Sequence, residues 1–158
     1  MKLHIDMEHK ILPFISTLLL FLFISLSPAI AQQNKLDPTM QELEDKSIRS
    51  LPEGTVYLKS YRADVLGQAQ EWVEYSLSLQ SGGKYVFSIA DLEQATSAGA
   101  LVFIYDRAQH KMASNFHNEK IYSSFEFHCQ GSGIYKLFIA FKDAADKKAC
   151  VSMAKKIN

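Results

Sequence analysis

The sequence has few of the features that mark a small disulfide-stapled or nucleotide-binding protein. It contains only two cysteines, Cys129 and Cys150. A miniprotein held by several disulfides is therefore excluded, and a hydrophobic core must hold the fold. The chain has no Cys-x-x-Cys pair and no glycine-rich loop of the phosphate-binding type. These absences remove the common cysteine-based and phosphate-binding motifs from consideration.

Charge of one sign is also lacking. Seventeen Lys and Arg balance 17 Asp and Glu, and the first 31 residues hold two of each sign, so the rest of the chain is also formally neutral. Nucleic acids and anionic membrane surfaces select a basic face. We therefore expect neither as a partner.

The one long hydrophobic run lies at the N-terminus. It extends over 16 residues, from Ile11 to Leu26, whereas a membrane-spanning helix needs ~20. Lysines precede the run, and Pro28 and the small-residue box Ala29-Ile30-Ala31 follow it. This order is typical of an export signal. We predict a signal peptide over residues 1–31, cleaved before Gln32.

This leader indicates where the mature protein works. No cysteine follows the cleavage box, so we expect no lipid anchor. We predict a soluble protein in the periplasm or outside the cell, with no stable membrane insertion. An uncleaved N-terminal anchor is the alternative. Asp6 and Glu8 neutralise the normally basic start of a leader, which leaves Met7 as an alternative first residue.

Residues 32–54 predict a linker with one short helix. Asp37 can cap the N-terminus of this helix, and Pro38 suits the first helical position. The apolar residues at helical spacing are Leu36, Met40 and Leu43. Pro52-Glu53-Gly54 is expected to stop the helix. One narrow apolar stripe favours packing on the flank of the domain over binding a partner.

After this segment the apolar residues alternate with polar ones, which is the period of a half-buried strand. The clearest case is Val73–Leu79, and we expect the turn Ser81-Gly82-Gly83 to join it to Tyr85–Ile89 in a hairpin. Leu101–Tyr105 is almost wholly apolar, as a central strand covered on both faces would be. The other expected strands are residues 55–59, 111–115, 123–129, 134–141 and 149–154.

About eight strands, with no helical pattern after Pro52, predict an all-β domain over residues 55–158. Their spacing favours an antiparallel β-sandwich or jelly roll. One-sided alternation disfavours a parallel sheet, which would be buried on both faces. The residues expected at the centre of the core are Val73, Tyr75, Leu77, Phe87, Ile89, Phe103, Phe125, Phe127, Leu137 and Ile139.

The two cysteines raise a question of pairing. An oxidising compartment favours a Cys129–Cys150 bridge. In a simple meander, however, Cys129 ends one strand and Cys150 opens another of the same direction, roughly 20 Å away. A disulfide needs Cα atoms within ~7 Å. We therefore expect two free thiols, with Cys129 buried beside Phe125 and Phe127. A Greek-key detour of the last strand would allow the bridge.

A set of strand and turn motifs runs from Gln70 to Phe141. Its segments are Trp72–Leu77, Gly82–Ile89, Ala100–Asp106, Met112–Ser114, Phe125–Phe127 and Gly131–Leu137. Their order resembles the bacterial pre-peptidase C-terminal domain, and this resemblance implies a small β-sandwich. Ala98-Gly99-Ala100 stands where that family often has an acidic residue, and no peptidase domain precedes it here. The missing acidic residue weakens any calcium site that the resemblance would imply, so calcium binding stays open.

Residues that could carry chemistry are few. The histidines of the predicted domain are His110, His117 and His128. None forms the close pair that a zinc site takes from one element. Gly131-Ser132-Gly133 fits a turn better than a nucleophile elbow, and Asp91 and Glu93 are the carboxylates considered for glycoside cleavage. We predict no catalytic residue, metal or cofactor. The alternative is a small secreted hydrolase on a jelly-roll scaffold, using His110, His117 or Asp91.

Aromatic side chains give a better indication of function. Trp72 has the opposite parity to Val73, so it should face away from the core, and Tyr57 and Tyr61 are candidates to join it. Exposed aromatic rings commonly bind sugars or peptides. We therefore predict an exported, non-catalytic binding or accessory module for a protein or polysaccharide. The alternative for Trp72 is that it covers an edge of the sandwich or packs under the helix.

Overall fold

The computed structural model describes residues 37–93 and 98–157, so the predicted leader lies outside the described residues. The elements are α2 (Pro38–Arg49), β1 (Thr55–Asp64), β2 (Trp72–Leu79), β3 (Lys84–Asp91), β4 (Gly99–Tyr105), β5 (Lys111–Ser114), β6 (Phe116–His117), β7 (Lys120–Ile121), β8 (Ser124–His128), β9 (Gly133–Lys142) and β10 (Lys148–Lys156). Among the helices described, none combines the length and the apolar character that crossing a membrane requires.

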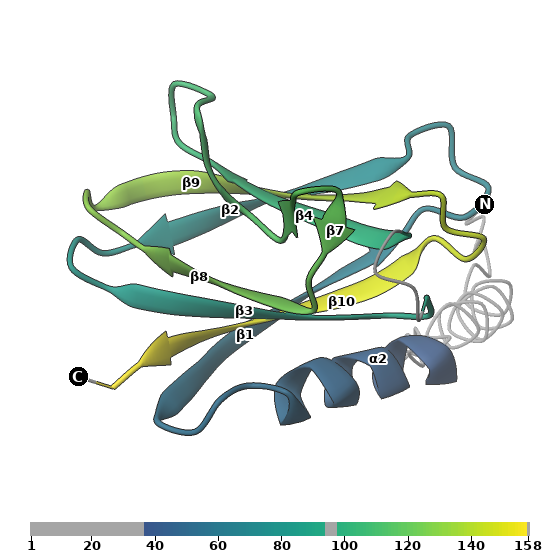
Figure 1. Cartoon of the computed structure of the whole chain (residues 1–158), viewed down its shortest axis with the longest axis horizontal. Coiled ribbons are helices and arrows are strands. Elements are labelled where there is room, and N and C mark those ends of the chain that lie inside the picture. Colours follow the sequence, from purple (N-terminus) through teal and green to yellow (C-terminus); the bar gives the residue numbers. More distant parts are fainter. Residues whose placement is uncertain (1–36, 94–97, 158) are drawn as a thin grey trace, which may run out of the picture. The chain divides into compact units, whose positions relative to one another are not determined.

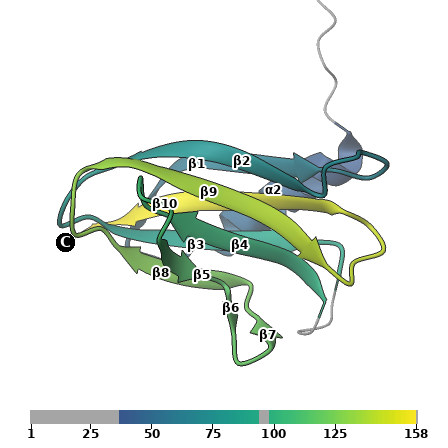
Figure 2. The same cartoon turned by 90° about the horizontal axis from the view of Figure 1, so that it is seen from above.

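Two four-stranded sheets pack face to face and confirm the predicted all-β sandwich (Figure 1). Sheet A has the strand order β1-β10-β3-β8, and sheet B has the order β2-β9-β4-β5. The paired strands of both sheets are antiparallel. The short strands β6 and β7, which the sequence did not predict, form a hairpin that projects from the sandwich (Figure 2).

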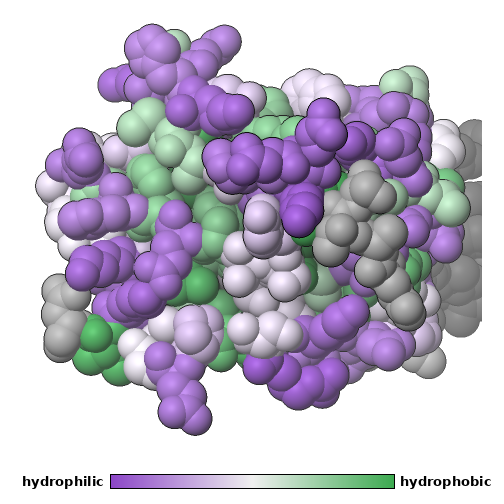
Figure 3. Space-filling view, viewed as in Figure 1, coloured by the Kyte–Doolittle hydropathy of each residue, from purple (hydrophilic) through white to green (hydrophobic). Residues whose placement is uncertain are grey.

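The core lies between the two sheets because each turns one row of apolar side chains toward the other. Six of the expected core residues are buried there: Leu77, Phe87, Ile89, Phe127, Leu137 and Ile139. Three more are partly buried and pack against it: Val73, Tyr75 and Phe125. On the side shown in Figure 3, apolar atoms appear between the polar side chains that cover most of the surface.

The expected hairpin between β2 and β3 is wrong. β2 pairs with β9 in sheet B, whereas β3 pairs with β10 and β8 in sheet A. The turn over Ser81-Gly82-Gly83 therefore carries the chain from one sheet to the other. Each strand has an apolar row that includes Leu77 in β2 and Phe87 in β3, and crossing between the sheets makes these rows face each other. Strand alternation alone does not distinguish this arrangement from a hairpin.

The expected burial of β4 on both faces is also wrong. Ala100, Val102 and Ile104 are buried in the core, whereas the alternate side chains are only partly buried. Phe103 is one of these, so its assignment to the core is corrected. It lies on the outer face of sheet B, where Tyr105 is its neighbour.

Strand β1 changes parity near its start. A register irregularity between Tyr57 and Lys59 interrupts its pairing with β10. Beyond it, Tyr61 and Ala63 enter the core, whereas Val56 and Leu58 before it are exposed. A bulge of this kind reverses which side chains face inward.

Helix α2 covers the outer face of sheet A. Asp37 caps it as predicted, accepting a hydrogen bond of 3.1 Å from the Thr39 N–H. The helix ends at Arg49 with Ser50 as its C-cap, before the proline expected to stop it. Met40 and Leu43 are buried in a cluster with sheet residues Ala90 and Cys150, which confirms the predicted packing role.

Both thiols are free and Cys129 is buried, as expected, and Cys150 is buried as well. Cys129 belongs to the core between the sheets, whereas Cys150 belongs to the cluster under α2. Strand β3 lies between β8 and β10 and shows how far apart the two cysteines are. Cys129 hydrogen-bonds Gly83 just before the start of β3, whereas Cys150 pairs with Ala90 near its end. Seven residues of strand place the two cysteines roughly 23 Å apart. The two cysteines are therefore too far apart for a disulfide, as predicted, but the strand that lies between theirs is β3 rather than β9.

Candidate ligand-binding groove

A groove of about 780 Å³ lies on the outer face of sheet B. This is the sheet that α2 does not cover, and Figure 2 shows it nearer the viewer, with α2 behind. The residues lining the groove are Trp72, Glu74, Phe103, Tyr105, Asp106, Arg107, Gln109, Ile134, Lys136, Phe138 and Ala140. Side chains of β2, β4 and β9 and of the turn after β4 therefore form one continuous surface.

The floor of the groove is the outward row of β9. This row runs from Ile134 to Ala140 and includes every second residue. At ~3.3 Å per residue it is about 20 Å long. The strand register places Trp72 opposite Ala140 on one side and Phe103 opposite Phe138 on the other. The strands therefore fix the positions of the groove's side chains.

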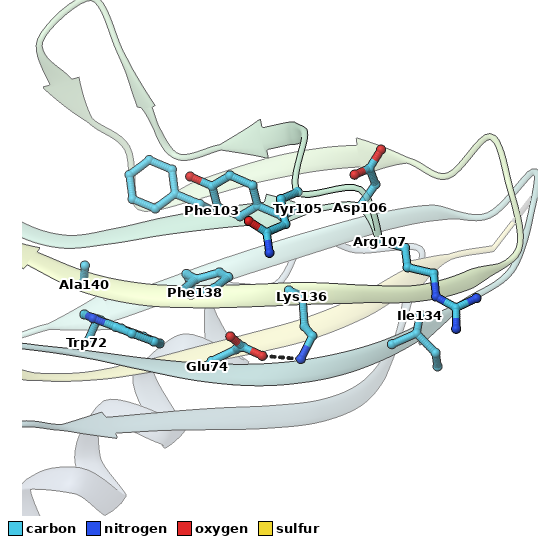
Figure 4. A pocket seen from close by; sticks show the side chains of 11 residues that line it. Trp72, Glu74, Phe103, Tyr105, Asp106, Arg107, Ile134, Lys136, Phe138 and Ala140 are labelled. Carbon is cyan, nitrogen blue, oxygen red and sulfur yellow. Dashed lines mark hydrogen bonds and ion pairs between the residues drawn. The ribbon is translucent and has the colours of Figure 1, made fainter. Parts of the chain in front are cut away.

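One end of the groove is aromatic. The rings of Trp72 and Phe138 have centroids 5.1 Å apart, and Phe138 meets Tyr105 edge-on at 5.3 Å. Phe103 adjoins Tyr105 at 6.3 Å. Trp72 remains 39% exposed. These four rings form a continuous apolar surface that water reaches (Figure 4).

Charged groups occupy the rest of the groove. Glu74 of β2 and Lys136 of β9 form an ion pair across neighbouring strands. Asp106 accepts hydrogen bonds from the backbone N–H of His110 and lies 3.1 Å from its ring Nδ1. The bond from this backbone N–H is the main reason that the pKa of Asp106 is lowered from its ordinary value.

Arg107 differs from these charged groups. Its side chain extends beside Ile134 at the end of the groove away from Trp72 (Figure 4). Within residues 37–93 and 98–157, no hydrogen bond or ion pair holds its guanidinium. Arg107 is exposed, and a guanidinium forms paired hydrogen bonds with a carboxylate. Arg107 therefore gives the groove an anion-binding end.

The three predicted ligand-binding aromatics do not meet. Trp72 lines the groove, in agreement with its predicted outward orientation. Tyr61 is 4% exposed in the core, and burial raises the pKa of its hydroxyl. Tyr61 is therefore not a ligand-binding residue of this exposed surface. Tyr57 is exposed near α2, where its hydroxyl lies 3.0 Å from that of Ser60 on the outer side of sheet A.

The residues considered for catalysis have local roles. Asp91 Oδ2 accepts a hydrogen bond of 2.7 Å from the Ala100 N–H, and burial raises the pKa of the Asp91 carboxyl. Gly99 has a φ of +126°, and a Cβ there would lie 2.5 Å from Asp91 Oδ2. Glu93 accepts from the Ala145 N–H at 3.0 Å. These carboxylates therefore hold loops at one end of the sandwich.

The histidines do not converge either. His110 contacts Asp106, whereas His117 lies on β6 and His128 on β8. No group of three metal-ligating side chains occurs in the part of the chain that the structure describes.

Sequence reasoning missed most of the groove. Phe103, Tyr105 and Phe138 lie in apolar runs that predict burial equally well on either side of a strand. Arg107 lies in a turn, where a charged residue is normally solvated. Trp72 alone gave a signal, because its strand alternates cleanly with polar residues.

No family model and no curated protein matches this chain. Among solved structures, the chain is similar to the crystal structure of PliG from Aeromonas hydrophila, a periplasmic lysozyme inhibitor of g-type lysozyme. This similarity covers 66% of the present chain and 87% of that chain, with 14% sequence identity and a TM-score of 0.40. The resemblance to the pre-peptidase C-terminal domain stays a prediction.

Proposed function

We propose that this protein is an exported, non-catalytic binding module that holds a protein segment or a polysaccharide in the groove on sheet B. The observation that carries the proposal is the continuous aromatic surface of Trp72, Phe103, Tyr105 and Phe138 on a sheet face that the rest of the described chain leaves open. Exposed apolar patches with polar rims are common at interaction sites.

The rigidity of the surface supports this role. Three neighbouring strands fix the groove's side chains, and the Glu74–Lys136 pair braces two of these strands. A surface that is already formed loses little entropy on binding. Such a groove suits recognition without chemistry, because the carboxylates nearest to a catalytic arrangement, Asp91 and Glu93, already bond to the backbone elsewhere.

The single tryptophan provides a direct test. Trp72 is the only tryptophan in the chain and lies in the groove. The exported protein is screened on arrays of oligosaccharides and of random peptides, and each hit is titrated while Trp72 fluorescence is recorded. We expect saturable binding accompanied by a change in fluorescence intensity or wavelength.

A matched pair of variants locates the site. Trp72→Ala and Tyr57→Ala each remove an exposed aromatic ring, 39% and 43% exposed, from opposite outer faces of the sandwich. We expect Trp72→Ala to weaken binding by about tenfold or more, because aromatic anchors contribute most at such sites. Tyr57→Ala should bind normally. Loss with Tyr57→Ala alone would place the site on sheet A and refute the proposal.

Export has its own test. The whole chain is expressed with its leader in a bacterial host, and the fractions are analysed by N-terminal sequencing. We expect a periplasmic or secreted product that begins at Gln32. A product that keeps Met1 or Met7 and remains in membranes would show that the leader is an anchor.

A further inference from the structure

We infer that the occupant of the groove is an extended protein segment, with an apolar side chain at the aromatic end and a carboxylate on Arg107. This inference rests on the proposed function and specifies the ligand of the same site. Three observations support this occupant: the tilt of the aromatic rings, the unpaired guanidinium of Arg107, and the spacing of the two ends of the groove.

The rings are tilted against each other. The interplanar angles are 44° between Trp72 and Phe138, 80° between Phe138 and Tyr105, and 47° between Phe103 and Tyr105. Sugar rings stack best on flat, exposed aromatic faces. Rings that touch at such angles instead form an uneven apolar surface, which suits an apolar side chain packed against it.

The hydrogen-bonding groups of the groove favour an anion at one end. Both carboxylates that line it have hydrogen-bond partners within the protein: Glu74 accepts from Lys136, and Asp106 accepts from the backbone N–H of His110. Among the described residues, no such partner holds the Arg107 guanidinium. Lys111 adds positive charge near the aromatic end, with its Nζ 5.9 Å from the centre of the Phe103 ring. A ligand carboxylate therefore finds an unused donor at the Arg107 end.

The length of the groove sets the spacing within the ligand. Phe138 marks the aromatic end and Ile134 lies beside Arg107, four residues away on β9, which is about 13 Å. An extended ligand that runs along β9 has the same rise per residue. Its residues i and i+4 project to the same side, as alternate residues of a strand do. The geometry thus assigns an apolar residue and an acidic residue four positions apart, in either chain direction.

The test is a selection from a phage-displayed library of random 12-residue peptides, with the exported protein as bait. We expect the enriched sequences to carry an apolar and an acidic residue four positions apart. A representative peptide, titrated by Trp72 fluorescence, should bind about tenfold more weakly to Arg107→Glu, since the charge that attracts its carboxylate is reversed. The same peptide with Lys in place of its acidic residue should bind Arg107→Glu better than the wild type.

The control is Arg49→Glu, which makes the same change of charge at the exposed end of α2 on the opposite face. It should bind the peptide normally. Enriched peptides without the acidic residue, or equal binding by Arg107→Glu, would overturn the inference. Binding of oligosaccharides but no peptides, still dependent on Trp72, would overturn it and leave the proposed function intact. Failure of both ligand classes would overturn both.

Discussion

The two outer faces of the sandwich differ in the size of their outward side chains, and this difference decides whether a helix can pack on them. On sheet A this row consists of small residues such as Ala90, Cys150 and Ser152, and α2 packs closely on it. On sheet B the row consists of large aromatic and charged residues, including Trp72 and Phe138, and no described helix covers it. Small side chains let a helix approach a sheet, whereas large ones form the walls of a groove.

The polar contacts differ in the same way. Under α2, the Ser47 and Ser152 hydroxyls lie 2.7 Å apart, and those of Ser152 and Ser60 lie 2.9 Å apart. These three hydroxyls thus form one network, although the buried hydroxyl of Ser88, opposite Ser152 on β3, has no partner among the described residues. In the groove, the exposed guanidinium of Arg107 has none among the described residues. Sheet A is therefore covered by its own helix, whereas the aromatic surface of sheet B is open.

The largest expected effect concerns the core that both faces share. Phe127 is 6% exposed and meets Tyr135 edge-on at 5.5 Å. Phe127→Ala should lower the free energy of unfolding by ~3 to 5 kcal/mol, since it leaves a cavity. Phe138→Ala, on the outer face of sheet B, should cost distinctly less. Urea unfolding measures both, and a loss below ~1 kcal/mol for Phe127→Ala would show that β8 has the opposite parity.

The next effect separates the two outer faces. Leu43 of α2 is 3% exposed against sheet A. Leu43→Ala should destabilise the fold by ~2 to 3 kcal/mol while ligand affinity in the groove stays unchanged, because the helix and the groove lie on opposite faces. Urea unfolding and a Trp72 titration on the same sample test this. Loss of affinity in a variant that is still folded would mean that the two faces are coupled.

How far the sequence predicts these faces depends on strand patterning. The helix cap at Asp37, the outward orientation of Trp72 and the separation of the cysteines follow from local rules. The aromatic groove does not. In β4 the outward residues are as apolar as the inward ones, so this strand alone does not reveal which side faces the core. The change of sheet at Gly82-Gly83 is hidden for a similar reason, since a turn between two alternating strands suits both arrangements.

A smaller effect comes from a matched pair of serines. Ser152 is fully buried beneath α2, whereas Ser76 is exposed on β2 of sheet B. Ser152→Val removes the hydroxyl that joins Ser47 and Ser60 and should cost ~1 to 3 kcal/mol. Ser76→Val should change the stability by less than ~0.5 kcal/mol. Equal effects in urea unfolding would contradict the proposed difference between the faces.

The smallest expected effect is on pH dependence. The Lys148 ammonium lowers the pKa of Asp37 at the cap of α2, whereas burial raises the pKa of Asp91 above its ordinary 3.8. The stabilisation from Asp37 is complete above pH 3.8 and is lost as the pH falls through the lowered pKa. The folded state binds the Asp91 proton more tightly than the unfolded state does, so the contribution of Asp91 improves as the pH falls through its raised pKa.

Asn variants separate these two carboxylates. Asp37→Asn keeps a good capping residue and removes the charge. Between pH 7 and pH 4, the wild type should keep its advantage over Asp37→Asn and gain stability relative to Asp91→Asn, and only below about pH 3.8 should the advantage over Asp37→Asn begin to fall. Urea unfolding at several pH values measures both differences. The same sign of change for both variants would show that one of the environments is described wrongly.

The central claim, that the outer face of sheet B is the binding surface, is tested most directly by NMR. Spectra of the ¹⁵N-labelled protein are recorded with and without a peptide selected on it. We expect the shifted amide signals to cluster on β2, β4 and β9 and in the turn at Arg107, together with the Trp72 indole N–H. Shifts that cluster on α2 and β1, with this indole signal unmoved, would contradict it.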